Sequence, residues 1–308
     1  MRILIFGATG FIGKELTNYL FDKKHEIAVI SRNKKKAEEI FSKNIQIIEW
    51  DFQNPYTLSR NITNVEVIIN LAGENIASKI WTKKHKENII KSRVHIGNLL
   101  TLSISQSEIK PKLLIQASAI GFYGSQTKDI CTENSLKGSG FLAQVSDKWE
   151  KSTEMVSEFG VKRIVIRTGV VLGKNGGMFP KLIAPIKYFM GSNFGKGDNF
   201  LSWIHIHDEI RAIEFLMNNK ESSGIYNLVS PNPITSIELN KLIGRKLRRP
   251  VWLIIPKFIL KLALREMANE LFFADQKVVP TKLLKEKFVF KYSKASFAIE
   301  SLLNKKTA

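Results

Sequence analysis

The sequence predicts an α/β protein with a doubly wound parallel sheet and a small C-terminal substrate or appendage domain. Three observations predict this class: a glycine-rich turn close to the N-terminus, an alternation of short apolar runs with helical segments, and a change of pattern beyond Gly173. With 308 residues and 44% hydrophobic content, the chain is long enough for one large domain and a smaller unit. We therefore expect a large Rossmann-like domain over residues 1–230 and a small C-terminal domain over residues 231–308.

The N-terminal glycine turn is the most informative motif. The segment Gly7-Ala8-Thr9-Gly10-Phe11-Ile12-Gly13 directly follows an apolar run and directly precedes residues with helical spacing. A strand, a tight turn and a helix in this order bring backbone N–H groups and the positive end of the helix towards a pyrophosphate. We expect this turn to bind a dinucleotide through Gly7, Thr9, Gly10, Phe11, Ile12 and Gly13.

Strand-like and helix-like segments alternate over the first half of the chain. The apolar runs lie at residues 3–6, 26–30, 45–48, 65–70, 112–116 and 163–166. The helical segments between them include residues 34–40, 83–105 and 141–159, the last ending before Gly160. On the helix over 83–105, Ile89, Ile90, His95, Ile96, Leu99 and Leu100 are expected to share one face. This alternation predicts ligands at the carboxyl ends of parallel strands.

The pattern beyond Gly173 is less regular. Glycine-rich stretches at residues 173–177 and 191–197 predict loops at the open edge of a site. An apolar helix is expected over residues 258–264, within the small C-terminal unit.

The end of the second expected strand indicates which cofactor binds. An acidic residue there accepts hydrogen bonds from the ribose of NAD, whereas the 2′-phosphate of NADP needs cations. The chain has Ser31-Arg32-Asn33-Lys34 at this point, with no Asp or Glu. Because the planar guanidinium of Arg32 suits a phosphate and Ser31 adds a donor, we predict NADP rather than NAD.

Composition limits the function classes. The formal net charge of +19 comes from dispersed lysines and from clusters such as Lys34-Lys35-Lys36 and Arg245-Lys246, which are not interleaved with aromatic residues. We therefore expect no nucleic-acid function. The one cysteine, Cys131, excludes an intrachain disulfide, and no long uncharged apolar run occurs, so a cytoplasmic protein is expected.

Several motifs together resemble a known family. LAGENIASKIWTKKHKENIIKSR, SAIGFYG, RTGVVLGKNGG and SWIHIHD look like the atypical subgroup of extended short-chain dehydrogenases/reductases called epimerase family protein, which has a Rossmann-type fold. Its members are sometimes labelled as similar to cell-division inhibitors. The resemblance implies that Asp51 and Phe52 lie near the adenine. It also implies that the cofactor runs along Leu71, Ala72 and Gly73. The residues implied to lie near the nicotinamide are Arg167, Thr168, Gly169 and Val170.

The usual catalytic pair of this superfamily is absent. Ordinary members place a tyrosine and, four residues later, a lysine on one helix face, but here the corresponding positions hold Leu142 and Ser146. The remaining candidates for acid/base chemistry are Ser118, Glu74 and Tyr123. For Tyr123 a packing role is weighed equally.

Other polar residues have structural alternatives. His205 and His207 would lie on one side of a strand, but no third ligand is patterned nearby, so no metal is predicted. Asp208 is expected to be the N-cap of the helix that runs to Met217. Arg93 is a candidate partner of an acidic substrate or of Glu74, and Trp203 is expected to pack over the site entrance.

Three functions follow from these observations. The first is an NADP-dependent oxidoreductase or epimerase for an unidentified small polar substrate, for example a nucleotide-linked one. The second is a non-catalytic NADP-binding sensor or scaffold. The third is a peripheral regulator, linked to cell division, in which residues 251–258 lie on anionic lipid; for this segment an ordinary core strand, turn and helix is the preferred interpretation.

Overall fold

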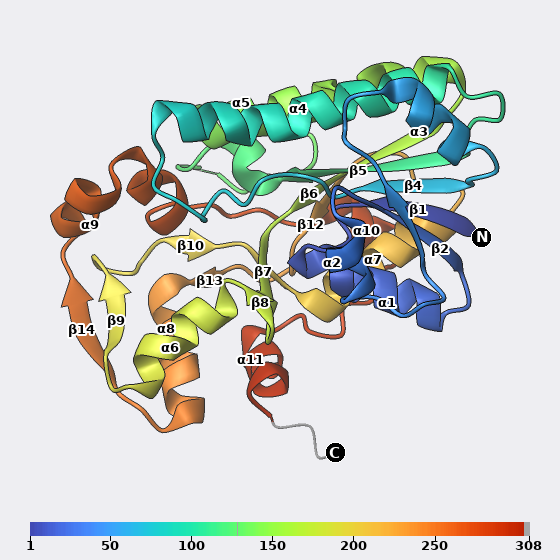
Figure 1. Ribbon diagram of the computed structural model, residues 1–308. Coiled ribbons are helices and arrows are strands. Elements are labelled where there is room, and N and C mark those ends of the chain that lie inside the picture. The colour runs from blue at the N-terminus through green and yellow to red at the C-terminus, as the bar shows by residue number, and fades with distance from the viewer. Residues whose placement is uncertain (128, 305–308) are drawn as a thin grey trace. The chain divides into compact units, whose positions relative to one another are not determined.

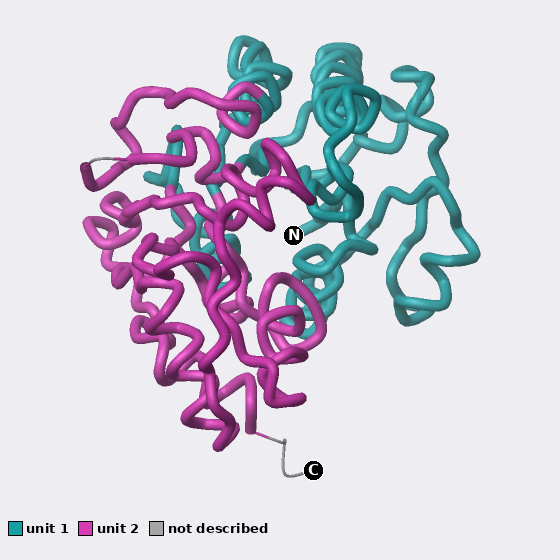
Figure 2. Tube along the Cα trace, turned by 90° about the vertical axis from the view of Figure 1, so that its left-hand side faces the viewer, with its two compact units in different colours: residues 1–118, 145–167, 210–226 teal, residues 119–144, 168–209, 227–308 magenta. Residues whose placement is uncertain are grey.

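The computed structural model describes residues 1–127 and 129–304. The chain forms two compact units, each assembled from separate segments (Figure 2). Unit 1 comprises residues 1–118, 145–167 and 210–226, and unit 2 comprises residues 119–144, 168–209 and 227–308. The chain therefore passes repeatedly from one unit to the other.

Unit 1 is organised around a seven-stranded sheet in the order β12-β6-β5-β4-β1-β2-β3 (Figure 1). Its strands are β1 (Arg2–Phe6), β2 (Glu26–Ser31), β3 (Gln46–Glu49), β4 (Val67–Asn70), β5 (Leu113–Ala119), β6 (Lys162–Thr168) and β12 (Gly224–Leu228). Strand β1 pairs in parallel with both β2 and β4, and the order reverses direction at β1. The predicted doubly wound fold is confirmed.

Helices cover both faces of this sheet. They are α1 (Phe11–Asp22), α2 (Lys34–Glu38), α3 (Pro55–Ile62), α4 (Lys83–Ser105), α5 (Phe141–Lys151), the 3-10 helix η2 (Glu154–Phe159) and α7 (Ile206–Asn218). Figure 1 shows α3 and α4 on one face and α1 on the other. A core that includes Phe6, Trp50, Ile68 and Leu100 fills the space between β1, β4, α3 and α4.

Helix α4 has the predicted bounds, and Leu100, Ile96 and Leu99 of its predicted face lie in or against the core. Ile89, Arg93, Gly97 and Leu100 are buried along it, whereas His95 is exposed. A Cβ on Gly97 would clash with the side chain of Ser152, so this glycine lets η2 and the end of α5 approach α4 closely. Hydropathy alone does not identify a glycine and an arginine as core positions, which is why Gly97 and Arg93 were missing from the predicted face.

The single helix expected over residues 141–159 is two helices. The hydroxyls of Ser152 and Thr153 donate to the carbonyls of Trp149 (2.7 Å) and Glu150 (3.4 Å). Such local bonds compete with the α-helical ladder. Helix α5 therefore ends at Lys151, and η2 ends at Gly160, which has the left-handed conformation of a C-terminal glycine.

The described residues of unit 2 form three small sheets and several helices. Strands β7 (Val170–Gly173), β8 (Gly176–Gly177) and β11 (Trp203–His205) form one sheet, β9 (Gly191–Phe194) pairs with β14 (Val251–Ile255), and β10 (Phe200–Leu201) pairs with β13 (Ile234–Thr235). The helices are η1 (Ile120–Tyr123), α6 (Phe179–Lys187), α8 (Ser236–Leu247), α9 (Lys257–Leu264), the π-helical turn η3 (Ala268–Phe272), α10 (Thr281–Lys285) and α11 (Ala295–Leu303).

Two predictions for unit 2 are wrong. Residues 191–194 of the expected loop form strand β9, because β14, far along the chain, supplies a pairing partner that local sequence cannot reveal. Trp203 lies fully buried in the core of unit 2 with Leu172, Phe179 and Ile299, and its indole N–H donates to the carbonyl of Asn232 at 3.0 Å. It therefore covers no site entrance. Among the described residues, no helix is both long and apolar enough to span a membrane.

Candidate functional site

One side of the glycine turn after β1 is tightly packed against the backbone of neighbouring residues. Gly7 has φ +73°, and a Cβ there would lie 2.7 Å from the carbonyl oxygen of Leu71. A Cβ on Gly13 would clash with the backbone of Gly7 and Ala8, so α1 lies directly against the turn. Both positions therefore require glycine for the close packing of strand, turn and helix.

The opposite side of the turn is open. Thr9 and Gly10 are exposed, and Gly10 precedes α1 without any side chain capping the N–H groups of the first turn. Uncapped N–H groups at the positive end of a 12-residue helix suit a pyrophosphate. The N–H of Gly10 is used within the turn, because it donates to the carbonyl of Gly7 at 3.0 Å. These features fit a dinucleotide, which Phe11 and Ile12 at the start of α1 would hold by their backbone N–H groups.

The end of β2 carries an exposed cation in a fixed turn. Ser31 donates to the carbonyl of Asn33 (2.9 Å) and accepts from its N–H (3.2 Å), so the hydroxyl serves the turn itself. Arg32 is exposed. The exposed Glu49, at the end of β3, accepts a bond from the backbone N–H of Lys34 at 3.1 Å. Arg32 is thus the group of the predicted set that can reach a ligand, while Ser31 shapes the loop.

The loop after β3 presents both predicted adenine residues. Phe52 has φ +59°, its ring centroid lies 4.7 Å from that of Trp50, and His95 Nε2 lies 2.8 Å from its carbonyl oxygen. Asp51 is exposed, and its carboxylate accepts from the N–H of Gln53. The positive φ of Phe52 marks a special backbone conformation at this site.

The loop after β4 is held by buried amides. Asn70 accepts a bond from the N–H of Ala72 (3.2 Å) and donates to Gln116 (2.9 Å), and the N–H of Leu71 donates to the carbonyl of Phe6. Gly73 is exposed. The backbone of residues 71–73 is therefore fixed by hydrogen bonds beside the glycine turn, and we call these three residues the ledge.

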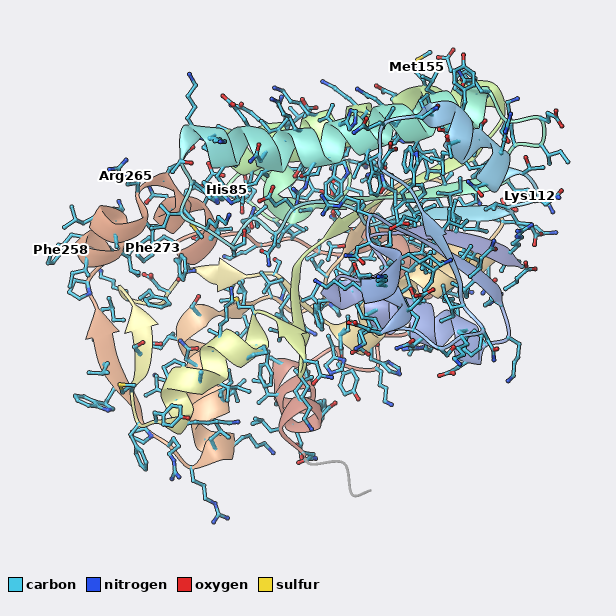
Figure 3. All side chains as sticks on the ribbon, in the orientation of Figure 1. His85, Lys112, Met155, Phe258, Arg265 and Phe273 are labelled. Atoms are coloured by element: carbon cyan, nitrogen blue, oxygen red, sulfur yellow. The ribbon has the colours of Figure 1, made fainter. Side chains whose placement is uncertain are left out.

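Next to this ledge lies a polar cluster, defined here as Glu74, His85, Arg93 and Trp149. Glu74 Oε1 is 3.4 Å from His85 Nδ1, and the Arg93 guanidinium stacks 4.7 Å from the Trp149 ring. A Cβ on Gly73 would lie 2.9 Å from the carbon of that guanidinium, so Arg93 lies against the ledge. Figure 3 labels His85 in the first turn of α4.

Three polar atoms of the polar cluster are buried without a hydrogen-bond partner: His85 Nε2, Arg93 Nε and Trp149 Nε1. Burial lowers the pKa of Arg93 to about 10, an effect that the negative charge of Glu74 opposes. Arg93 therefore still carries its charge at neutral pH. The side chain of Glu74 is 35% exposed, so the cluster has one carboxylate within reach of a ligand.

The hydroxyl of Ser118 is hydrogen-bonded to a buried ion pair between Glu150 and Arg167. Its hydroxyl donates to Glu150 Oε1 at 2.5 Å, and Arg167 donates to both oxygens of that carboxylate at 2.9 Å. All three side chains are buried. The guanidinium of Arg167, predicted near the nicotinamide, thus neutralises Glu150, and Ser118 completes the hydrogen bonds of that carboxylate.

Tyr123 is also buried, and its hydroxyl is hydrogen-bonded within the core of unit 2. It is 4% exposed, and its hydroxyl donates to Asn227 Oδ1 at 2.7 Å in unit 2. The positions that replace the usual tyrosine and lysine differ in surroundings: the N–H of Leu142 donates to Glu270 (2.7 Å), and Ser146 is buried. Lys148, the neighbouring cation on α5, is exposed.

Sequence reasoning missed several carboxylates that are buried in unit 2, among them Glu209 and Glu270. Glu209 is fully buried, accepts from the hydroxyl of Thr168 at 2.7 Å, and has its other oxygen unpartnered, and this burial raises its pKa to about 8. Glu270 accepts from the N–H groups of Phe141 and Leu142 at the start of α5. No motif signals either residue, because their partners lie far away in sequence.

The predicted arrangement around His205 and His207 is wrong in two respects. Strand β11 ends at His205, and His207 lies in α7, so the two residues do not share a strand. Asp208 lies inside α7 rather than at its N-cap, because its carboxylate accepts from the N–H groups of Lys291 and Tyr292. Within residues 1–127 and 129–304, no group of three or more His, Cys, Asp or Glu is placed to hold a metal ion.

This fold and this glycine turn define the class of protein. Residues 3–228 match the NAD dependent epimerase/dehydratase family, and residues 255–302 match a domain of unknown function, DUF1731. The chain belongs to the NAD dependent epimerase/dehydratase family and binds a nicotinamide cofactor.

Within that class, the chain is similar to proteins named epimerase family protein. It is 35% identical to YfhF of Bacillus subtilis over 98% of both chains, and 33% identical to the chloroplastic SDR39U1 homologue of Arabidopsis thaliana over 98% of this chain and 87% of the relative. The crystal structure of human SDR39U1 with NADPH superimposes with a TM-score of 0.87 at 26% identity, covering 98% of this chain and 99% of the other. The resemblance inferred from the motifs is confirmed.

Proposed function

We propose that this protein is an NADP(H)-dependent oxidoreductase or epimerase acting on a small polar substrate. The observation that carries the cofactor preference is the exposed Arg32 at the end of β2, where no residue from 31 to 34 is acidic. The solved relative named SDR39U1 contains NADPH, which supports the same preference. When bound, the nicotinamide would supply the hydride chemistry.

Calorimetric titration with NADPH and with NADH tests this preference. We expect tighter binding of NADPH, and we expect Arg32→Glu to weaken NADPH binding by at least about tenfold while changing NADH binding little, since the charge faces only the 2′-phosphate. Arg60→Glu, at an exposed cation on α3, is the matched control. An equal loss for both cofactors would reject the role of Arg32.

For the proton transfer we propose Glu74. Of the three candidates, Ser118 and Tyr123 donate their hydroxyl protons to buried oxygens, whereas the carboxylate of Glu74 is partly exposed at the carboxyl end of β4. In oxidation, Glu74 would accept the proton of the substrate hydroxyl; in reduction, it would return that proton to the carbonyl oxygen. His85 would act as a positioning residue for this carboxylate, and Arg93 would attract an anionic substrate.

Turnover can be tested with diacetyl and phenanthrenequinone as generic carbonyl probes for NADPH oxidation. We expect Glu74→Gln to lower kcat by about 10²-fold or more with unchanged NADPH affinity, because general acid/base groups contribute on that order. His85→Asn should change the pH profile of kcat, which a merely structural role would not do. Glu87→Gln, at an exposed carboxylate on α4, is the control.

The alternative function is a non-catalytic NADP-binding sensor or scaffold. It is favoured by Leu142 and Ser146 at the positions of the usual tyrosine and lysine. NADPH binding without turnover of any carbonyl or alcohol probe, in wild type and Glu74→Gln alike, would support this alternative.

A further inference from the structure

Unit 2 carries an exposed apolar face that its own core does not use. Helix α9 has no buried residue, and Phe258 and Leu262 on it are 70% and 84% exposed. On the preceding strand β14, Trp252 and Ile254 are 65% and 69% exposed. Figure 3 labels Phe258 where β14 gives way to α9. The segment therefore does not form the ordinary core strand, turn and helix that the sequence favoured.

The apolar face continues onto the end of α6. Tyr188, Phe189 and Met190 are all exposed, and the indole N–H of Trp252 donates to the carbonyl of Phe189 at 3.1 Å. We call Phe189, Trp252, Ile254, Phe258 and Leu262 the apolar face. Five large hydrophobic side chains that are all more than half exposed, on elements that follow or pair with one another, mark an interaction surface.

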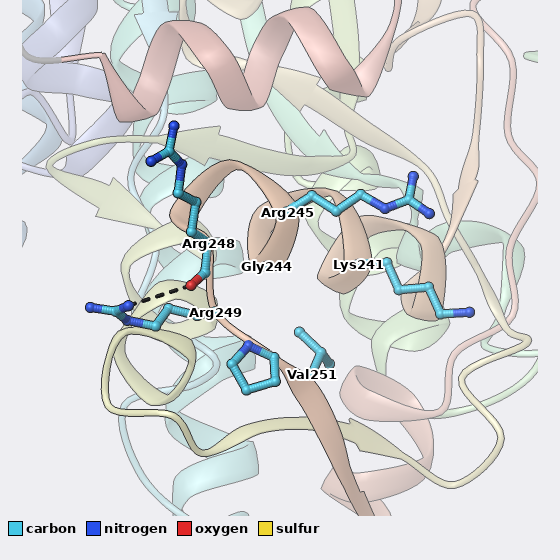
Figure 4. A pocket seen from close by; sticks show the side chains of 7 residues that line it. Lys241, Gly244, Arg245, Arg248, Arg249 and Val251 are labelled. Atoms are coloured by element: carbon cyan, nitrogen blue, oxygen red, sulfur yellow. Dashed lines mark hydrogen bonds between the residues drawn. The ribbon is translucent and has the colours of Figure 1, made fainter.

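Cations border the apolar face. Arg249 stacks 4.2 Å above the ring of Phe189, and it lines a hollow of about 340 Å³ together with Lys241, Arg245 and Arg248 (Figure 4). These four residues are defined as the basic hollow. Lys257 and Lys261 add charge on α9 itself.

Along the sequence no acidic residue interrupts this charge, although Lys246 pairs with Glu300 at 2.9 Å. From Leu239 to Arg265 the sequence has eight cationic residues and no Asp or Glu, and residues 174–197 likewise have cations but no acid. The partner must therefore offer both negative charge and an apolar phase. An anionic lipid bilayer offers both, since its headgroups attract Lys and Arg and its interface accepts Trp, Phe and Leu side chains.

We infer that unit 2 binds the surface of anionic membranes, with the basic hollow against lipid phosphates and the apolar face inserted into the interface. A second copy of this chain fits less well, because a two-fold contact through the same face would bring like charges together. Nucleic acid also fits less well. The aromatic rings of the apolar face could stack on bases, but the equally exposed Ile254 and Leu262 could not, whereas a lipid interface accepts both kinds of side chain. The inference is independent of the proposed enzymatic function.

Co-sedimentation of the full chain with vesicles tests the inference. We expect binding to equimolar phosphatidylcholine and phosphatidylglycerol, and no binding to phosphatidylcholine alone. The fluorescence of Trp252 should shift to the blue on binding and should be quenched by brominated lipid. Sedimentation without that shift and quenching would mean charge adsorption only, and it would overturn the inserted arrangement.

Variants separate the two parts of the surface. Phe258→Ser with Leu262→Ser should weaken vesicle binding by about tenfold or more at every salt concentration. Arg248→Glu with Arg249→Glu should weaken it by at least about tenfold and reduce its salt dependence. Leu136→Ser and the pair Lys43→Glu and Lys91→Glu, all at exposed positions elsewhere, are the matched controls.

Retained NADPH binding would show that each variant is folded. No vesicle binding at low salt by wild type would overturn the inference. So would a dimer that Phe258→Ser with Leu262→Ser dissociates, or preferential binding of RNA that competes with vesicles.

Discussion

At the scale of single residues, the site depends on side chains whose neighbours the sequence does not reveal. The places of the first-turn glycines between β1 and α1, and of Arg32 at the end of β2, could be predicted, because strand, turn and helix are local in sequence, whereas their contacts with a cofactor stay predictions. Arg93 and Glu209 could not be placed, because their surroundings come from segments distant along the chain. The ledge after β4 was likewise beyond prediction, since the amides of Asn70 and Gln116 meet only across neighbouring strands.

Glu209 gives a pH-dependent stability that can be measured. Its pKa is raised by burial from the ordinary value of 4.5 to about 8, so the folded protein holds a proton that the unfolded chain releases. Stability should therefore fall as pH rises from about 4.5 to about 8, with a slope of up to about 1.4 kcal/mol per pH unit from this group, and then level off. Urea unfolding at several pH values measures this slope.

Glu209→Gln should remove that slope, because the amide does not titrate. Glu158→Gln, at an exposed carboxylate on η2, should keep it. Equal slopes in wild type and Glu209→Gln would contradict the assignment.

At the scale of elements, α5 shows how one helix depends on a distant turn. Phe141 and Leu142 donate their N–H groups to the two oxygens of Glu270 at 2.6 and 2.7 Å, so η3 supplies the negative cap of the helix. Gly140, with φ +106°, lies directly against this carboxylate. Helix α5 was predicted from its own spacing, but its cap was not, because the capping residue lies well over a hundred positions away.

Replacing that cap should loosen the start of α5. We expect Glu270→Gln to lower the free energy of unfolding by about 1–2 kcal/mol, because the amide offers one acceptor where the carboxylate offers two. Hydrogen exchange at Phe141 and Leu142 should accelerate. Glu158→Gln serves again as the control, and unchanged exchange in Glu270→Gln would show that α5 does not need this cap.

At the scale of the whole molecule, the sheet was more predictable than unit 2. Six parallel strands could be predicted, because short apolar runs alternate with segments of helical spacing. Their order in the sheet is the one that a doubly wound topology gives. The short strands of unit 2 have no such rhythm. Strands β9 and β14 pair although more than fifty residues separate them in the sequence. The glycine-containing segment of β9 becomes a strand because β14 pairs with it, and its own sequence does not indicate this partner.

The core of unit 2 joins Leu172, Phe179 and Trp203 to Ile299 and Leu302 of α11. A ribosome must therefore synthesise the chain through Leu302 before this core can close. The sheet of unit 1 has most of its strands much earlier, although β12 arrives only at residues 224–228. During synthesis, a nascent chain with a largely formed nucleotide-binding half would thus carry the apolar side chains of unit 2 exposed, and this interval is when chaperones have the most surface to bind.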